Sequence, residues 1–305
     1  MTELRTTHRT TVTEDMIDHL GHMNVRWYGV AARAASEAVV RDLGGEGDLA
    51  VDAVDVYTRH FNEQLLGAEL EVRSAVLAAG GGSLRVYHEL RNTGSGDLAA
   101  SFVHRLEATS GGDVVAEWPP AVEGRGDIPE HGRPRTISLD TEPLAAAPTL
   151  AELQADPLLA MRHPRRIEAE ECRPDGGYDP GNGPMLLWGG EPLEGATGPT
   201  LHAGPNGEVV GWATMEHRMA ISRLPRLGDR IQSFGCVVEL FDKVTHRLMW
   251  AYDLDAEELL VAFEVVDIAL DTVSRRAVPI PGELRGHAEA RLRPDLLPTA
   301  GDEDR

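Results

Sequence analysis

Three features that define other protein classes are scarce in this chain: lysine, cysteine and long apolar runs. Lys243 is the only lysine, and 50 acidic residues against 29 basic ones give a formal charge of −21 over 305 residues. This charge repels phosphate backbones, so we expect no nucleic-acid partner. No uninterrupted apolar run approaches the roughly 18–20 residues that cross a bilayer, so we expect no membrane partner either.

The scarcity of cysteine points to a reducing compartment. Cys172 and Cys236 have neither disulfide-framework nor metal-site spacing, and buried thiols behave as small apolar groups. The first residues lack the apolar segment of a signal peptide. No set of histidines has convincing metal-ligand spacing, and His217 and His246 are predicted to be isolated strand residues. We therefore expect a cytoplasmic protein without a metal or other cofactor.

Residues 18–28 carry the most chemistry. They read Asp-His-Leu-Gly-His-Met-Asn-Val-Arg-Trp-Tyr and place an acid, an imidazole and an amide around a glycine turn. An apolar-periodic segment follows, and a helix N-terminus offers unpaired N–H groups and a positive dipole end to a developing oxyanion. Two interpretations remain open: a site that cleaves an activated acyl group, or a turn in which Asp18 or Asn24 simply caps the helix.

The pattern of the first half predicts an α+β arrangement. Residues 4–17 alternate like a strand, and apolar residues recur at helical spacing from Met23 to Leu43, with Gly44 and Gly45 as the end of the helix. Strand-like segments follow at 51–61, 68–78, 83–92 and 98–108. A sheet of such strands can wrap the helix and bury one face of it.

The second half repeats this plan at a shift of 161 residues. The shift aligns five pairs: Arg5 with Arg166, Asp18 with Asp179, Trp27 with Trp188, Gly67 with Gly228, and Phe102 with Phe263. At this shift the second turn keeps the acid but has Gly183 in place of His22 and Met185 in place of Asn24. Glycines and a proline near 189–195 are expected to interrupt the second helix.

The repeat also predicts the domain organisation. We predict an active first domain (1–140), a linker with one short helix (141–163), a degenerate second domain (164–290) and a frayed tail (291–305).

A strand, then Asp-x-x-Gly-His-x-Asn, then a helix with aromatic residues resembles the hotdog-fold acyl thioesterases. Two fused copies resemble the double-hotdog acyl-carrier-protein thioesterases and the 4-hydroxybenzoyl-CoA thioesterase-like proteins. The resemblance implies two tandem hotdog domains, each a long helix wrapped by an antiparallel sheet, which form an intramolecular double hotdog. It also implies hydrolysis of an acyl-CoA or acyl-carrier-protein thioester, without a cofactor, by a protein that could assemble as a homodimer of double-hotdog units.

The resemblance assigns roles to single residues. Asp18 matches the family carboxylate that acts as nucleophile or general base, His22 matches the histidine four residues later, and Asn24 matches the asparagine at the helix start. Leu20 departs from the family, where an asparagine is common. Glu63 and Gln64 lie near the position of a further acidic residue in the plant enzymes.

Local chemistry adds a substrate-binding set to these roles. Backbone N–H groups of Met23 to Val25 are predicted to hold the oxyanion. Trp27 and Tyr28 either line the acyl pocket or pack in the core, the latter being favoured for Trp27.

Two other functions compete with hydrolysis. A hotdog enoyl-thioester hydratase or dehydratase also uses an acid and a histidine, but typically five residues apart behind an Asn-Pro, whereas Asp18 and His22 are four apart. A non-catalytic acyl-thioester binder would tolerate Leu20 and the altered second turn.

Overall fold

The computed structural model describes residues 3–18, 20–43, 49–80, 82–110, 113–114, 124–193, 201–204 and 207–298. The chain divides into two compact units, residues 1–134 and 135–305. Each unit is described by itself below. Gly44 and Gly45, predicted to end the first helix, lie outside the described residues.

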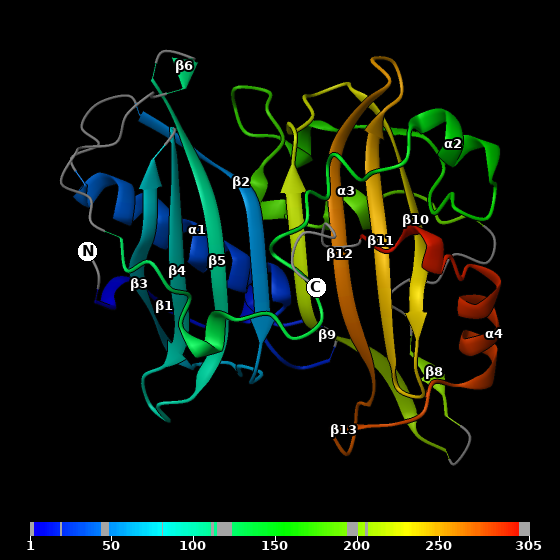
Figure 1. Cartoon of the computed structure of the whole chain (residues 1–305). Helices are drawn as coiled ribbons and strands as arrows, with labels where there is room; N and C mark the ends of the chain where they lie inside the picture. Colours follow the sequence, from blue (N-terminus) through cyan, green and yellow to red (C-terminus); the bar gives the residue numbers. More distant parts are fainter. Residues whose placement is uncertain are drawn as a thin grey trace. The chain divides into compact units, whose positions relative to one another are not determined.

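The first unit consists of an antiparallel sheet and one long helix (Figure 1). Strand order in the sheet is β1-β3-β4-β5-β2, with the short β6 paired to β5. The elements are β1 (Arg5–Thr11), the 3-10 helix η1 (Glu14–Met16), α1 (Val25–Asp42), β2 (Leu49–His60), β3 (Glu69–Gly80), β4 (Ser83–Asn92), β5 (Leu98–Ser110), β6 (Asp113–Val114) and η2 (Glu130–Gly132). The predicted helix and the four predicted strand segments after it are confirmed. The predicted strand 4–17 is a shorter strand followed by a 3-10 turn.

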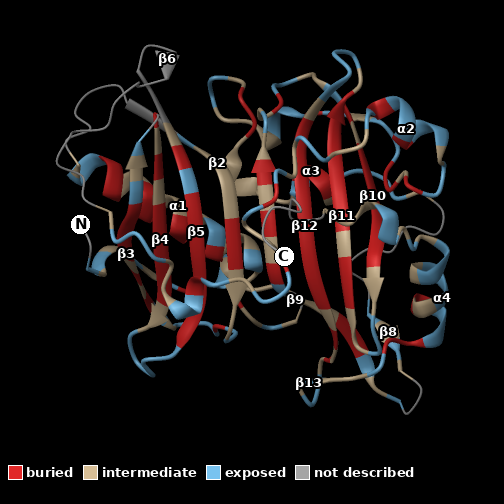
Figure 2. Ribbon diagram, in the orientation of Figure 1, coloured by how far each residue is buried: buried red, intermediate tan, exposed pale blue. Residues whose placement is uncertain are grey.

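Helix α1 lies against the sheet because one face of it is small and apolar. Its alanines at 31, 32 and 35 are buried against residues of β3, β4 and β5, and Tyr28 and Met23 extend this apolar cluster toward the start of the helix. Val39 and Val40 form a second apolar cluster at the other end of the helix. The buried residues follow the strands beneath α1 (Figure 2).

The second unit has the same strand order in its sheet, β7-β10-β11-β12-β9. Short strands β8 and β13 pair with β9 and β12. The elements are α2 (Leu150–Ala155), β7 (Arg165–Arg166), η3 (Ala169–Glu171), η4 (Pro180–Asn182), α3 (Met185–Trp188), β8 (His202–Ala203), β9 (Val209–Ile221), β10 (Arg230–Leu240), β11 (Val244–Asp253), β12 (Glu258–Asp271), β13 (Arg276–Ala277), α4 (Gly282–Ala290) and η5 (Pro294–Leu296).

The long strands of the two units correspond at the predicted shift of 161 residues. Phe102 and Phe263 occupy the same register in β5 and β12, against matching positions of the neighbouring strands. Gly67 and Gly228, each just before the next strand, have φ values of 81° and 86°, which glycine adopts without strain. The sequence duplication is therefore also a structural one.

The strand-to-helix turn corresponds at a different shift, of 155 residues. The backbone hydrogen bonds that define the first turn recur in the second at this shift. The matched pairs are Asp18 N to His22 O with Arg173 N to Gly177 O, Gly21 N to Asp18 O with Gly176 N to Arg173 O, and Asn24 N to Met16 O with Asp179 N to Glu171 O. Gly21 and Gly176 also share a positive φ, of 82° and 79°.

This correspondence corrects two of the predicted pairs. The structural equivalents of Asp18, His22 and Asn24 are Arg173, Gly177 and Asp179. The second turn therefore has an arginine at the position of Asp18, and its aspartate, Asp179, stands at the position of Asn24.

The predicted pair of Arg5 with Arg166 is also wrong. Arg166 pairs with Arg230 as Thr11 pairs with Glu69, so Arg166 corresponds to Thr11.

The change of shift places the extra residues of the second unit after Asp179, where α1 stands in the first unit. There the chain forms η4, a glycine turn at Gly183 and the short α3, so the predicted interruption of the helix is confirmed.

The segment predicted as a linker belongs to the second unit. It contains one short helix, α2, as expected, whose first residues carry a capping box from Thr149 and Glu152. The tail was expected to fray after Arg291, and this is wrong for its described part. Leu296 and Leu297 pack against the apolar cluster that Leu150 and Leu153 of α2 form with β10 and β11.

Candidate active site

The turn before α1 is built by backbone hydrogen bonds that leave its side chains arranged around the helix start. Asp18 N donates to His22 O at 2.9 Å and Gly21 N donates to Asp18 O at 3.0 Å. The Asp18 side chain accepts from Leu20 N at 2.8 Å, which fixes one carboxylate oxygen. Asp18 thus caps the turn and not the helix, since the N-cap of α1 is Asn24.

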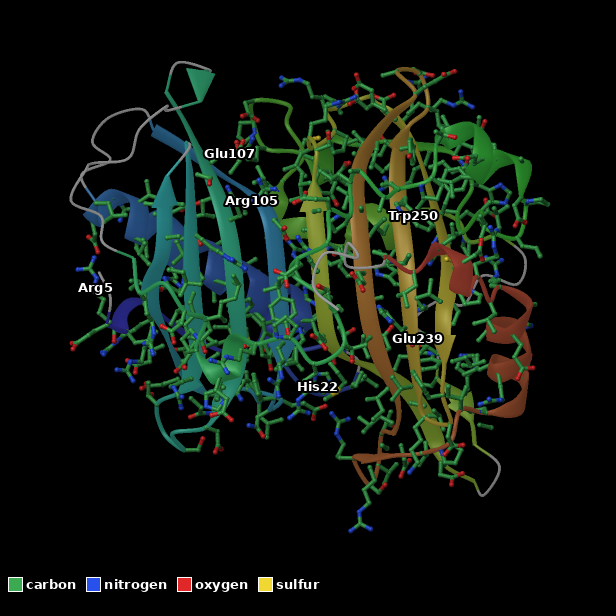
Figure 3. The ribbon with its side chains drawn as sticks, in the orientation of Figure 1. Arg5, His22, Arg105, Glu107, Glu239 and Trp250 are labelled. Atoms are coloured by element: carbon green, nitrogen blue, oxygen red, sulfur yellow. The ribbon has the colours of Figure 1, made fainter. Side chains whose placement is uncertain are left out.

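Three ionisable side chains meet at this turn. His22 Nδ1 lies 3.5 Å from Asp18 Oδ2, and His22 Nε2 lies 3.6 Å from Glu63 Oε1 (His22 is labelled in Figure 3). The side chains of Asp18 and His22 are 13% and 14% exposed, whereas Glu63 is 43% exposed. The imidazole therefore stands between a sheltered carboxylate and a solvent-facing one. The sequence had indicated each of these residues separately, and the fold brings them together.

Asn24 is the N-cap of α1, as one of the two sequence interpretations proposed. Its side-chain oxygen accepts from Arg26 N at 2.9 Å. Met23 N and Asn24 N donate to Gln64 O and Met16 O, so these two amides are not free to hold an oxyanion, contrary to the prediction. Val25 N–H is the remaining candidate, since none of the described residues accepts from it.

The predicted substrate-binding side chains divide between core and surface. Met23 and Tyr28 are buried, Trp27 is partly buried against the same cluster, and Val25 is exposed. Tyr28 Oη donates to Asn62 O at 3.3 Å. Burial, with the nearby Asp18 charge, raises the pKa of Tyr28 to about 12 although a hydrogen bond to Gln64 lowers it. Tyr28 is therefore a neutral phenol at physiological pH.

Gln64 fixes the Glu63 segment in place. It is buried, and its backbone oxygen accepts from Met23 N at 2.8 Å. Its side-chain oxygen accepts from Asn92 Nδ2 at 2.9 Å, and its amide donates to Asn62 O at 3.2 Å. Gln64 therefore supports the position of Glu63 from within the fold.

Replacing the cap of α1 should have a measurable cost in stability. We expect Asn24→Ala to lower the free energy of unfolding by about 1 kcal/mol, because the first-turn amide of Arg26 loses its acceptor. Chemical denaturation of the two proteins measures this difference. Asn24→Asp keeps the acceptor and serves as the control; an equal loss in both variants would contradict the capping role.

The equivalent turn of the second unit cannot perform the same chemistry. A Cβ atom built on Gly177, which corresponds to His22, would lie 3.1 Å from Nη2 of Arg173. The guanidinium thus occupies space near the position of the imidazole. At the strand shift, Leu224 corresponds to Glu63. An acid, a histidine and a second acid are replaced by an arginine, a glycine and a leucine.

Two polar clusters were missed by the sequence interpretation. His246, predicted to be isolated, has 2.9 Å and 2.8 Å contacts from its ring nitrogens to Glu239 and Glu264. Burial alone would lower the pKa of His246, but hydrogen bonds to Glu264 and Glu239 outweigh it and raise the pKa. The second cluster joins His88 and His104 under α1. The alternation of inward positions along the strands is the signal that could have revealed both.

Some site types have no counterpart in the described part of the chain. The residues that the structure describes contain no group of three or more His, Cys, Asp or Glu side chains placed to hold a metal ion. Among the same residues, no helix combines the length and apolarity needed to cross a membrane.

Comparison with solved structures identifies the fold. No family model and no curated protein sequence matches this chain. A protein assigned as an oleoyl thioesterase from Lactobacillus plantarum matches with a TM-score of 0.62 and 12% identity, over 92% of this chain and 98% of that one. An acyl-ACP thioesterase from Bacteroides thetaiotaomicron matches with 0.57 and 10%, over 87% and 97%.

A third match has the same character. The 12:0-ACP thioesterase from Umbellularia californica matches with a TM-score of 0.57 and 12% identity, over 86% of this chain and 93% of that one. At such identities the likeness establishes the fold. The chain has the mostly antiparallel, hotdog-type fold of these thioesterases.

Proposed function

We propose that this protein is an acyl thioesterase that hydrolyses an acyl-CoA or acyl-carrier-protein thioester to a carboxylic acid and a free thiol. The observation that carries the proposal is the Asp18–His22–Glu63 arrangement at the start of α1. The likeness in fold to proteins named as acyl thioesterases supports it.

The roles of the three side chains follow from their surroundings. Asp18 is sheltered and has one oxygen held by Leu20 N–H, which favours a role in orienting His22 over direct attack on the thioester. Nε2 of His22 and Oε1 of Glu63 lie 3.6 Å apart, so one water molecule beside the pair can contact both groups at ordinary hydrogen-bond distance. Catalytic hydrogen bonds are often long before substrate binds.

The proposed reaction is a water attack with balanced proton transfers. The water oxygen bonds to the thioester carbonyl carbon while its proton passes to His22 or Glu63. The carbon–sulfur bond then breaks, and the same proton passes to the leaving sulfur. Val25 N–H and the positive end of the α1 dipole stabilise the negative charge on the carbonyl oxygen.

The acyl chain is proposed to lie along the inner face of α1. The apolar cluster that begins at Met23 and Tyr28, beside the candidate site, continues under the alanines of the helix. We further propose that the two units assemble as a double hotdog in which the second supports the first, and that such molecules can form homodimers.

The test is a panel of acyl-CoA and acyl-carrier-protein thioesters of increasing chain length, followed with a thiol reagent. We expect thiol and carboxylic acid to appear in equal amounts. An enoyl thioester that loses its conjugation without releasing thiol would instead identify a hydratase. Tight binding of acyl-CoA without thiol release would identify a binding protein and contradict the proposal.

A further inference from the structure

A chain of five polar side chains crosses the interior of the first unit. It runs from β1 through β3 and β4 to α1 and ends on β5. Its members in order are Thr7, Ser74, His88, Ser36 and His104, with successive contacts of 2.6 Å, 2.6 Å, 2.9 Å and 2.9 Å. All but Thr7 are at most 3% exposed.

The protons of this chain can be assigned, because each hydroxyl donates once and a neutral imidazole carries one N–H. Thr7 donates to Val72 O, so it accepts from Ser74, and Ser74 in turn accepts from His88 Nδ1–H. Burial lowers the pKa of His88 well below its usual value, which makes its Nε2 a bare acceptor.

The same logic reaches the end of the chain. Ser36 donates to Nε2 of His88 and therefore accepts from Nδ1–H of His104. Burial lowers the pKa of His104 to about 4, so its ring is neutral and its Nε2 carries a lone pair. That nitrogen is buried and has no hydrogen-bond partner among the described residues. A buried acceptor without a donor is costly and calls for an explanation.

The unpaired nitrogen lies at the end of the apolar cluster that leads from the candidate site. The His104 ring packs edge-on against Phe102, 5.9 Å between centroids, and Phe102 belongs to that cluster. Ser36 lies about 18 Å along α1 from Asn24, since a helix rises ~1.5 Å per residue. Beyond it, Val39 and Val40 belong to the other cluster. The polar chain therefore separates the two.

The polar chain is specific to the unit that carries the candidate site. At the strand shift, Ser74, His88 and His104 correspond to Gly235, Met249 and Val265, which cannot form it. The histidine pair and the Asp18–His22–Glu63 arrangement thus occur in the same unit, and both are missing from the other.

We propose that His104 is a specificity-determining residue whose Nε2 accepts a hydrogen bond from a hydroxyl group near the far end of the acyl chain. The inference rests on the proposed function and names its substrate class: long hydroxyacyl thioesters, hydroxylated away from the thioester. Binding of such a chain supplies the donor that the folded protein lacks. An unsubstituted chain leaves the nitrogen unpaired as before and therefore binds without this gain.

The experiment compares CoA thioesters of one chain length at a time: unsubstituted, 3-hydroxy and ω-hydroxy. At the matching length we expect kcat/KM for the ω-hydroxyacyl substrate to exceed that of the unsubstituted one by about tenfold or more. The 3-hydroxy substrate should gain nothing, because its hydroxyl stays near His22. Equal values for unsubstituted and ω-hydroxy substrates at every length would overturn the inference while leaving thioester hydrolysis intact.

Variants test the residue itself. His104→Leu, of similar volume, should bring the kcat/KM values of the ω-hydroxy and unsubstituted substrates together, and a cooperative unfolding transition in denaturant reports that the variant is folded. His104→Gln restores an acceptor and should recover part of the preference, which covers the case in which the leucine variant fails to fold. A preference that survives in His104→Leu would overturn the assignment. If the wild-type protein hydrolyses none of these thioesters, the proposed function fails, and this inference with it.

Discussion

Replacing Asp18 by asparagine is expected to lower kcat for thioester hydrolysis on the order of 10²–10⁴-fold. The amide keeps the size of the side chain and can still accept from Leu20 N–H, but it carries no charge to orient His22. The expected effect falls on kcat more than on KM, because Asp18 is sheltered and acts on the ring and not on the bound substrate. Steady-state thiol release by the two proteins measures it.

The second unit supplies the matched control for this substitution. Asp179→Asn makes the same chemical change at the residue that the sequence alone had paired with Asp18. Asp179 is the N-cap of η4, and asparagine caps as well as aspartate. We expect its activity to be unchanged. Equal losses in both variants, or no loss in Asp18→Asn, would contradict the assignment of activity to the first turn.

Acid is expected to destabilise the first unit through its buried histidines. The pKa of His104 is lowered by burial to about 4 from 6.5, so between these values the unfolded chain binds a proton that the folded protein does not. The contribution of the neutral His104 ring to the free energy of unfolding is therefore fully present above pH 6.5, and it is lost as the pH falls toward 4. The loss is on the order of 3 kcal/mol for His104, with His88 adding to it in the same direction.

Denaturant unfolding at several pH values tests this directly. Carboxylates elsewhere also contribute to acid unfolding, so the informative quantity is the difference between wild type and His104→Leu. The variant should lose less stability between pH 6.5 and 4 than the wild type, by the amount that His104 contributes. Parallel pH profiles for the two proteins would show that His104 is not buried as a neutral ring.

Much of the fold could be predicted because it follows from periodic patterns. The helical spacing of apolar residues after Met23 and the turn glycines at Gly67 and Gly228 marked the elements that the structure contains. The matched pairs Gly67 with Gly228 and Phe102 with Phe263 also predicted the correct shift between the two sheets. Such local signals survive divergence because each is tied to burial or to a backbone angle.

The pairing of the two turns was predicted wrongly because identity of residue type misled. Asp18 and Asp179 match in the sequence at the strand shift, but the hydrogen bonds of the turn place Arg173 opposite Asp18. The second unit has extra residues after Asp179, which change the shift, and nothing in the composition of the sequence reveals where they were inserted. Backbone hydrogen bonding decides such cases, and one sequence does not contain it.

The candidate site could be predicted only in part. Asp18, His22 and Asn24 are close in the chain, so their proximity follows from the turn itself. The contact of Glu63 with His22 depends on where the segment before β3 passes the start of α1. The hydrogen bond from Met23 N to Gln64 O fixes that position. The polar chain under α1 joins residues from five elements, and only the assembled fold brings them together.

The most direct measurement of the central claim is thiol release from one long-chain acyl-CoA by wild type and by His22→Gln. Glutamine keeps hydrogen-bonding groups but cannot take and return a proton. The account predicts thiol and acid in equal amounts from the wild type, and a rate lower on the order of 10²-fold or more in the variant. Equal rates for the two proteins, or no thiol release by the wild type with any acyl chain, would contradict it.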